Sequence, residues 1–210
     1  QQVAEYGRVE GPLNLVRVYL QEGRNQKAVS VLQKLEQSAE TGPFWTKEWL
    51  TGVANRKQGR LVEAEQNFRN VLGYQTEDMR RRGFDFSKDV EIINLLGLTL
   101  FDQAARQYAI DDAEGAETLM RRAAEVFGAA LKVDSENPVA HHNLQRLYAL
   151  LDQTDLANRH RELFRRYRPD DHAWGMVASL AHERYPAASR SAEPVVVYPL
   201  TLTAPAVSNR

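Results

Sequence analysis

The sequence predicts an all-α protein made of about four helix–turn–helix pairs, followed by a capping helix and an extended tail. In the stretch 45–71, apolar residues recur at three- and four-residue steps on both sides of a turn at Gly59. This pattern indicates two amphipathic helices that pack together. Similar intervals return elsewhere, since 36 residues separate Gly23 from Gly59 and 34 separate Ala123 from Ala157. A helical pair that recurs at such intervals predicts a stack of repeats.

The first pair is expected over residues 9–42. Pro12 suits the first turn of a helix, because the N–H that a proline lacks would have no partner there. Gly23 can turn the chain, and Ala28 then marks the second helix. The sequence Thr41-Gly42-Pro43 combines a stop signal with a start signal and separates this pair from the next.

The second pair, residues 43–74, contains the residues that let two helices approach closely. Gly52 in the first helix has no side chain, and Ala64 in the second helix is small. Phe68 lies one turn beyond Ala64 and can fill the remaining space. We therefore expect the two helices to cross near Gly52 and Ala64.

Residues 73–87 lack helical periodicity and are expected to form an ordered insertion between the second and third pairs. Tyr74, Phe84 and Phe86 lie in it and need a place to pack. Ser87 is a suitable N-cap residue and is expected to begin the helix that follows.

The third and fourth pairs are expected over residues 88–135 and 137–169. The interval from Gly97 to Ala123 exceeds the corresponding interval in the second pair by fourteen residues. The simplest explanation lengthens both helices of the third pair by about two turns, at about 3.6 residues per turn. Pro138 then opens the fourth pair.

The pairs and a capping helix at 170–185 would form one helical domain, residues 1–186. The prolines of the remaining tail, residues 187–210, exclude a continuous helix there. Its apolar run is Val195, Val196, Val197 and Tyr198. We expect this run to be ordered and extended, in contact either with the chain's own helices or with a partner.

Composition narrows the function further. The 210 residues carry a formal net charge of −1, which does not suggest nucleic acid as a partner. The absence of cysteine excludes disulfides, thiolate metal sites and covalent haem attachment within this sequence. No apolar run is long enough to span a bilayer. Because the first residues have neither an initiator methionine nor a signal-peptide pattern, we expect the chain to begin inside a longer precursor.

The spacing of Gly52, Ala64 and Phe68 resembles that of the tetratricopeptide repeat (TPR) family, whose unit of about 34 residues is a helix–turn–helix. The resemblance covers most of the chain and implies a right-handed superhelix that acts as a protein-binding scaffold. The motifs GxSxG, GxGxxG and the P-loop are absent, and the carboxylates are scattered. We therefore expect no enzymatic activity.

In TPR proteins the first helix of each pair lines the concave surface, which implies a partner-binding groove here. The residues so placed are Arg17, Trp49, Val53, Arg56, Lys57, Asn94, Phe101, His142 and Arg146. This set is apolar with a basic bias, and it lacks the full Lys/Asn/Arg pattern of the carboxylate-clamp members of the family. Two interpretations stay open: these side chains bind a ligand, or several of them pack between neighbouring pairs.

Histidines and arginines gather in the last third of the sequence. The histidines are His141, His142, His160, His172 and His182. No two of them lie at the i, i+4 spacing of a helical metal site, so we expect packing or surface roles and no metal or other cofactor. A haem or metal carrier is the alternative. The arginines within 159–168 and 80–82 are expected to form solvated faces and ion pairs within the chain.

Three segments resemble a narrower group, the C-terminal TPR region of bacterial secreted multi-haem c-type cytochromes. They are residues 78–87, 95–101 and 192–200. The resemblance implies a periplasmic or extracellular location, a larger assembly, and a multi-haem cytochrome as electron-transfer partner. The alternative function is a TPR adaptor that binds peptides on its own.

Overall fold

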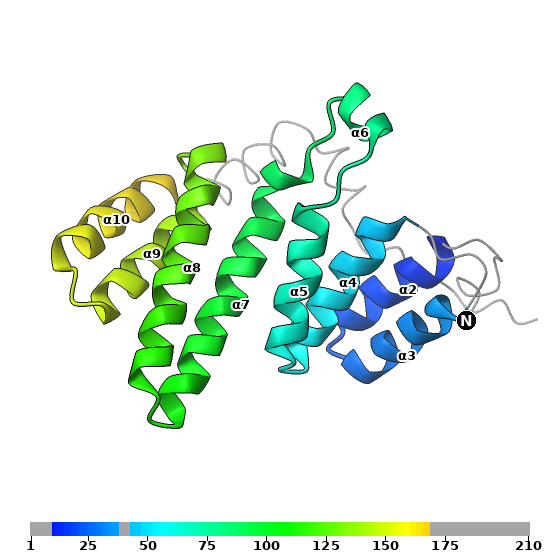
Figure 1. Ribbon diagram of the computed structural model, residues 1–210, viewed down its shortest axis with the longest axis horizontal. Helices are drawn as coiled ribbons and strands as arrows, with labels where there is room; N and C mark the ends of the chain where they lie inside the picture. Colours follow the sequence, from blue (N-terminus) through cyan, green and yellow to red (C-terminus); the bar gives the residue numbers. More distant parts are fainter. Residues whose placement is uncertain (1–9, 38–42, 169–210) are drawn as a thin grey trace, which may run out of the picture. The chain divides into compact units, whose positions relative to one another are not determined.

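The computed structural model describes residues 10–37 and 43–168. Every regular element in these residues is a helix and none is a strand, which confirms the all-α prediction. The elements, shown in Figure 1, are α2 (Glu10–Gln21), α3 (Asn25–Glu36), α4 (Phe44–Lys57), α5 (Leu61–Leu72), α6 (Glu77–Arg81), the 3-10 helix η1 (Phe86–Lys88), α7 (Val90–Ala109), α8 (Ala113–Val133), α9 (Pro138–Leu150) and α10 (Thr154–Tyr167).

Helices that follow one another pack together in pairs: α2 with α3, α4 with α5, α7 with α8, and α9 with α10. Neighbouring pairs are joined mainly through α3 against α4, α5 against α7, and α8 against α9. The first helices also meet directly where α2 touches α4 and where α7 touches α9. These contacts place α2 beside α4 and α7 beside α9 as the first helices of their pairs.

The four pairs turn through the same backbone conformation. Gly23, Gly59, Asp111 and Asp152 occupy corresponding positions and have φ of 73°, 78°, 62° and 57°. In each turn the next residue donates its backbone N–H to a carbonyl five residues earlier, as Arg60 does to Asn55 at 2.8 Å. This is the Schellman motif, whose left-handed position glycine adopts without strain and aspartate tolerates better than most residues.

Two helix crossings are made by a glycine facing a phenylalanine. A Cβ atom added to Gly52 would lie 2.7 Å from Cε1 of Phe68, and one added to Gly97 would lie 2.7 Å from Cζ of Phe127. Both phenylalanines are fully buried. The close approach expected at Gly52 therefore occurs in the second pair and again in the third.

The expected lengthening of the third pair is confirmed. Helix α7 has 20 residues and α8 has 21, against 14 for α4 and 12 for α5. The added length carries Tyr108 in the last turn of α7 and Ile110 at its C-cap, which are 68% and 73% exposed. This added length extends the α7–α8 pair beyond its neighbours (Figure 1).

The buried apolar side chains form two clusters whose boundary runs through the second pair. One cluster joins α2, α3 and α4 and includes Leu50 and Ala54. The other joins α5, α7, α8 and α9 and includes Phe68 and Phe127. Trp49 and Val53 of α4 contact both clusters.

The insertion between the second and third pairs is ordered and contains α6 and η1. Tyr74 packs on Phe44 at 4.8 Å between ring centroids, and Phe86 packs on Trp45 at 5.6 Å. Phe84 does not pack as expected, because 60% of it is exposed beside the turn that ends α6.

The N-cap prediction at Ser87 is also wrong. Asp89 caps α7, and its Oδ1 accepts the Ile92 backbone N–H at 3.1 Å. Ser87 belongs to η1 and donates its hydroxyl to Asp85. Serine and aspartate are similar N-cap residues, and the 3-10 turn placed before the helix moves its start to Asp89.

Several predictions lie outside the part of the chain that the structure describes. They are the capping helix at 170–185, the tail from 187 with Val195 to Tyr198, and the histidines His172 and His182. Within residues 10–37 and 43–168, no helix combines the length and the apolar character that crossing a membrane requires.

Candidate functional site

The residues predicted to line a groove all lie on α2, α4, α7 and α9, which we call the first-helix face. At its N-terminal end, Arg17 of α2 lies over the ring of Trp49 of α4, with Cζ 5.7 Å from the ring centroid. Arg17 also donates to Oδ1 of Asn14 at 2.8 Å. Arg17 is exposed and Trp49 is half-buried, so the guanidinium covers one side of an accessible indole.

In the middle of the face, Arg56 of α4 donates to Oδ2 of Asp102 of α7 at 2.7 Å. Val53, half-buried, packs against both apolar clusters. Lys57 is exposed and has no hydrogen bond or ion pair with the residues that the structure describes. Arg56 thus joins two pairs, whereas Lys57 remains available to a ligand.

At the C-terminal end, α7 and α9 are joined by two contacts. Nδ2 of the buried Asn94 donates to Oδ1 of Asn137, the N-cap of α9, at 3.1 Å. The guanidinium of Arg146 lies 4.9 Å from the ring centroid of Phe101. His142 is half-buried and packs on Phe164 of α10, with 4.9 Å between ring centroids.

The structure divides this set into side chains held between helices and side chains exposed to solvent. Asn94 and Phe101 are buried between helices, and Arg56 is held by its ion pair. Arg17, Lys57 and Arg146 are exposed on the same four helices. All three exposed side chains are basic.

A pocket of about 290 Å³ opens beside Arg17 and Trp49. We call it the aromatic pocket. Its remaining walls include Trp45 of α4, Phe86 of η1, and Asp89 and Glu91 at the start of α7. All three rings are half-buried, and Glu91 is exposed without a partner among the described residues.

Only part of this pocket could be predicted from the sequence. Trp45 and Trp49 share a helix face, which periodicity shows. Phe86, Asp89 and Glu91 reach the pocket because the insertion folds back onto α4 through the contact of Phe86 with Trp45. The spacing of residues along the sequence does not predict this contact between the insertion and α4.

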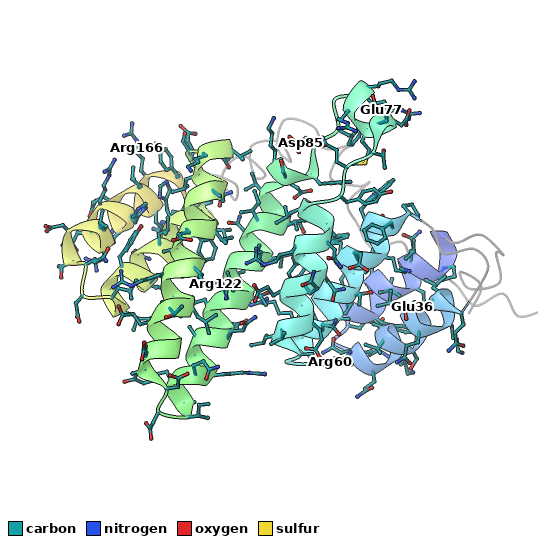
Figure 2. All side chains as sticks on the ribbon, viewed as in Figure 1. Glu36, Arg60, Glu77, Asp85, Arg122 and Arg166 are labelled. Carbon is teal, nitrogen blue, oxygen red and sulfur yellow. The ribbon has the colours of Figure 1, made fainter. Side chains whose placement is uncertain are left out.

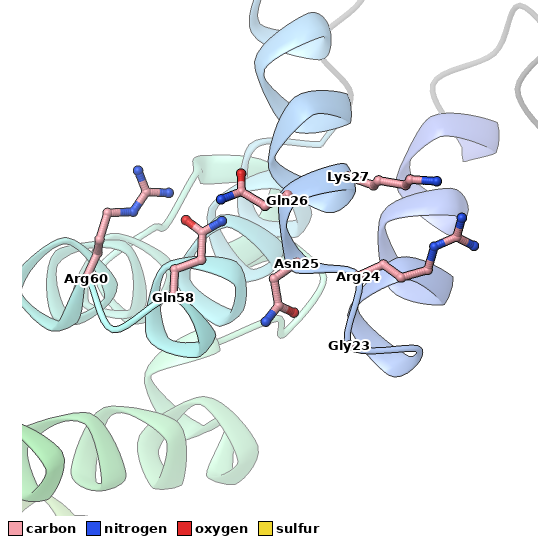
Figure 3. A pocket seen from close by; sticks show the side chains of 7 residues that line it. All are labelled: Gly23, Arg24, Asn25, Gln26, Lys27, Gln58 and Arg60. Atoms are coloured by element: carbon pink, nitrogen blue, oxygen red, sulfur yellow. The ribbon is translucent and has the colours of Figure 1, made fainter.

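A larger, open pocket of about 670 Å³ lies elsewhere, between the turns of the first and second pairs. Its lining includes Arg24, Lys27 and Arg60, so it has a basic character. These cations do not converge, because Arg24 and Lys27 point away from Arg60 (Figure 3). Arg24 is also paired with Glu22 at 2.8 Å.

On the second helices, Glu65 of α5 connects three helices of two pairs. It accepts from Nε of Arg69 at 2.9 Å, from Nε2 of Gln103 of α7 at 2.9 Å, and from Nη2 of Arg122 of α8 at 2.6 Å. Figure 2 shows Arg122 on the side of α8 that borders α7. Burial raises the pKa of Glu65, but these hydrogen bonds and positive charges outweigh it and hold the pKa below its ordinary value.

Two histidines meet across the fourth pair. Nδ1 of the buried His141 and Nδ1 of His160 are 2.9 Å apart, and Nε2 of His141 is 3.1 Å from the carbonyl oxygen of Ser135. Because a carbonyl only accepts, His141 carries its proton on Nε2 and accepts from His160 when both are neutral. Burial, with the nearby charges of His141 and Arg159, lowers the pKa of His160 to about 4.

The arginine stretches form ion pairs, as expected. Arg80 pairs with Glu77 at 3.0 Å, and Arg165 pairs with Glu162 at 2.8 Å. In the described ranges, no three histidine, aspartate or glutamate side chains are grouped so that they could hold a metal ion.

The described part of the protein is defined by its fold, an all-α arrangement of helix–turn–helix pairs. No protein-family model matches the chain, and no curated protein matches it.

Proposed function

We propose that this chain is a non-enzymatic protein–protein interaction scaffold of the TPR type, and that it binds its partner on the first-helix face. The observation that carries the proposal is the aromatic pocket between α2, α4 and α7, with exposed cations farther along the same helices. A concave pocket that combines aromatic side chains with a few charged groups is typical of a recognition site. The four turns of common geometry and the glycine–phenylalanine crossings further support the TPR assignment.

The partner class follows from the narrower resemblance. The segments 78–87 and 95–101 resemble the TPR region of secreted multi-haem cytochromes, so we propose a periplasmic or extracellular assembly with such a cytochrome. The alternative is a stand-alone adaptor that binds peptides. A haem or metal carrier receives no support from His141, because both of its ring nitrogens already contact groups within the chain.

Site-specific photo-crosslinking tests the proposal. A crosslinker at position 57, on the first-helix face, should capture one defined protein from native periplasm and membranes. The same crosslinker at position 34, an exposed lysine of the second helix α3, should not. A haem absorption band in the captured protein would favour the cytochrome assembly, and its absence would favour the adaptor.

The captured pair is then purified and its affinity measured. Lys57→Glu should weaken binding at least about fivefold, the size of one interfacial charge contact. Lys34→Glu should leave the affinity unchanged. Equal effects of the two reversals, or equal crosslinking from both positions, would remove the first-helix face as the binding surface.

A further inference from the structure

The aromatic pocket has a chemical character that the rest of the first-helix face lacks. Of the residues predicted to line that face, the exposed ones are the cations Arg17, Lys57 and Arg146, whereas this pocket carries two carboxylates, Asp89 and Glu91. Two positive charges partly offset these carboxylates: the guanidinium of Arg17 and the partial charge at the start of α7, which is roughly half a unit. The walls therefore remain net negative.

The rings add a second preference. Trp45, Trp49 and Phe86 present half-buried aromatic surface to the pocket. Aromatic faces attract cations, and a planar guanidinium stacks on them better than an ammonium does. The chain itself uses this contact, because the guanidinium of Arg17 lies 5.7 Å from the centre of the Trp49 ring.

We propose that the aromatic pocket binds an arginine side chain of the partner protein, stacked on the indole rings and paired with Glu91. The volume of about 290 Å³ suits a single side chain, since pockets for larger ligands begin near this size. Arg17 occupies part of the pocket in the free chain and moves aside when the partner's arginine enters. This inference rests on the proposed function and names the partner's chemistry at that site.

The test uses the full chain and three short peptides: acetyl-Gly-Arg-Gly-amide, its citrulline analogue and its glutamate analogue. Citrulline keeps the shape of arginine and removes its charge. Binding is followed by NMR through the indole N–H signals of Trp45 and Trp49, the two tryptophans that line this pocket. We expect the arginine peptide to shift these signals with at least about threefold higher affinity than the citrulline peptide, as one cation–π contact and one exposed ion pair provide.

Two surface variants then give effects of opposite sign. Glu91→Gln should weaken the arginine peptide about two- to fivefold and leave the citrulline peptide unchanged, whereas Glu63→Gln, at the start of α5, should change neither. Arg17→Ala should strengthen arginine binding, because the competing guanidinium and its charge are gone.

Four outcomes would overturn the inference: equal affinity for arginine and citrulline, preference for glutamate, loss of binding in Arg17→Ala, or no shift of either indole up to the solubility limit. In each case capture of a protein at Lys57 could still succeed, so the scaffold proposal would stand alone. Conversely, if the arginine peptide shifts the indole signals but crosslinking at position 57 captures no protein, the scaffold proposal would be contradicted. The arginine preference of the aromatic pocket would still be supported.

Discussion

Glycine at the centre of a helix usually weakens it, but Gly52 and Gly97 each allow a phenylalanine of the facing helix to be buried completely. In the third pair, an added Cβ at Gly97 would meet Cζ, Cε1 and Cε2 of Phe127 at 2.7–2.9 Å. Real Cβ atoms do not approach a ring so closely, so the ring or the helix would have to move. Packing therefore determines the residue at position 97, against the preference of the helix.

Gly97→Ala should destabilise the protein by about 1–3 kcal/mol, the usual effect of overpacking. Gly128 provides the matched control, because it lies within α8 and an added Cβ would meet nothing within 4 Å. Gly128→Ala should stabilise by roughly 0.5–1 kcal/mol through helix propensity alone. Urea unfolding of both variants measures the difference, and two changes of the same sign would contradict this account.

Residue-scale predictions were accurate where one helix pair contains the whole signal. Gly52 and Phe68 lie within 17 consecutive positions and meet as the spacing predicts, and Ala64 between them is fully buried. The N-cap at Asp89 was missed, because the sequence offers two suitable residues and the 3-10 turn decides between them. Exposed Phe84 was missed because composition does not show which aromatic residues the insertion can cover.

At the scale of elements, the fourth pair is held by a different chemistry from the second and third. Arg161 stands where the earlier pairs have Phe68 and Phe127, and it is exposed. The ring of His160 instead stacks between α9 and α10, 5.5 Å from the Tyr148 ring and 5.2 Å from the His141 ring. Spacing within one helix could not predict this contact, because it joins residues 19 positions apart across a turn.

The stability of the fourth pair should fall as the pH falls from about 6.5 to about 4. The pKa of His160 is about 4 in the folded chain and 6.5 ordinarily, so the unfolded chain binds the extra proton first and folding is disfavoured. Thermal unfolding followed across this range should show a steeper decline for the parent than for His160→Phe, which keeps a ring and cannot be protonated. Parallel declines would show that other groups cause the pH dependence.

At the scale of the whole described chain, helix pairs and apolar cores do not coincide. Helix α4 contributes Leu50 to the first cluster, and its partner α5 contributes Phe68 to the second. The second and third pairs are joined additionally by polar contacts, Arg56 with Asp102 and Glu65 with Arg122. The all-α class was predictable from periodicity, whereas these links depend on side chains 46 and 57 positions apart.

Glu65→Ala should lower the free energy of unfolding by about 1–3 kcal/mol, because it leaves Gln103 and Arg122 without their shared partner. Hydrogen exchange should then separate α2–α5 from α7–α10, with amides of the first group opening more often. Glu117→Ala is the control, since its pair with Arg121 lies within α8 and is exposed. Glu117→Ala should lower the free energy of unfolding by less than about 0.5 kcal/mol. Equal losses would show that Glu65 does not couple the pairs.

The common turn geometry also defines where this chain can be cut and rejoined. Gly23, Gly59, Asp111 and Asp152 share one backbone path, although 36, 52 and 41 residues separate them in succession. A segment between two such positions, which contains the second helix of one pair and the first helix of the next, begins and ends with similar φ angles whatever its length. The four turns are therefore equivalent splice points, at which modules of unequal size can be exchanged without designing a new connection.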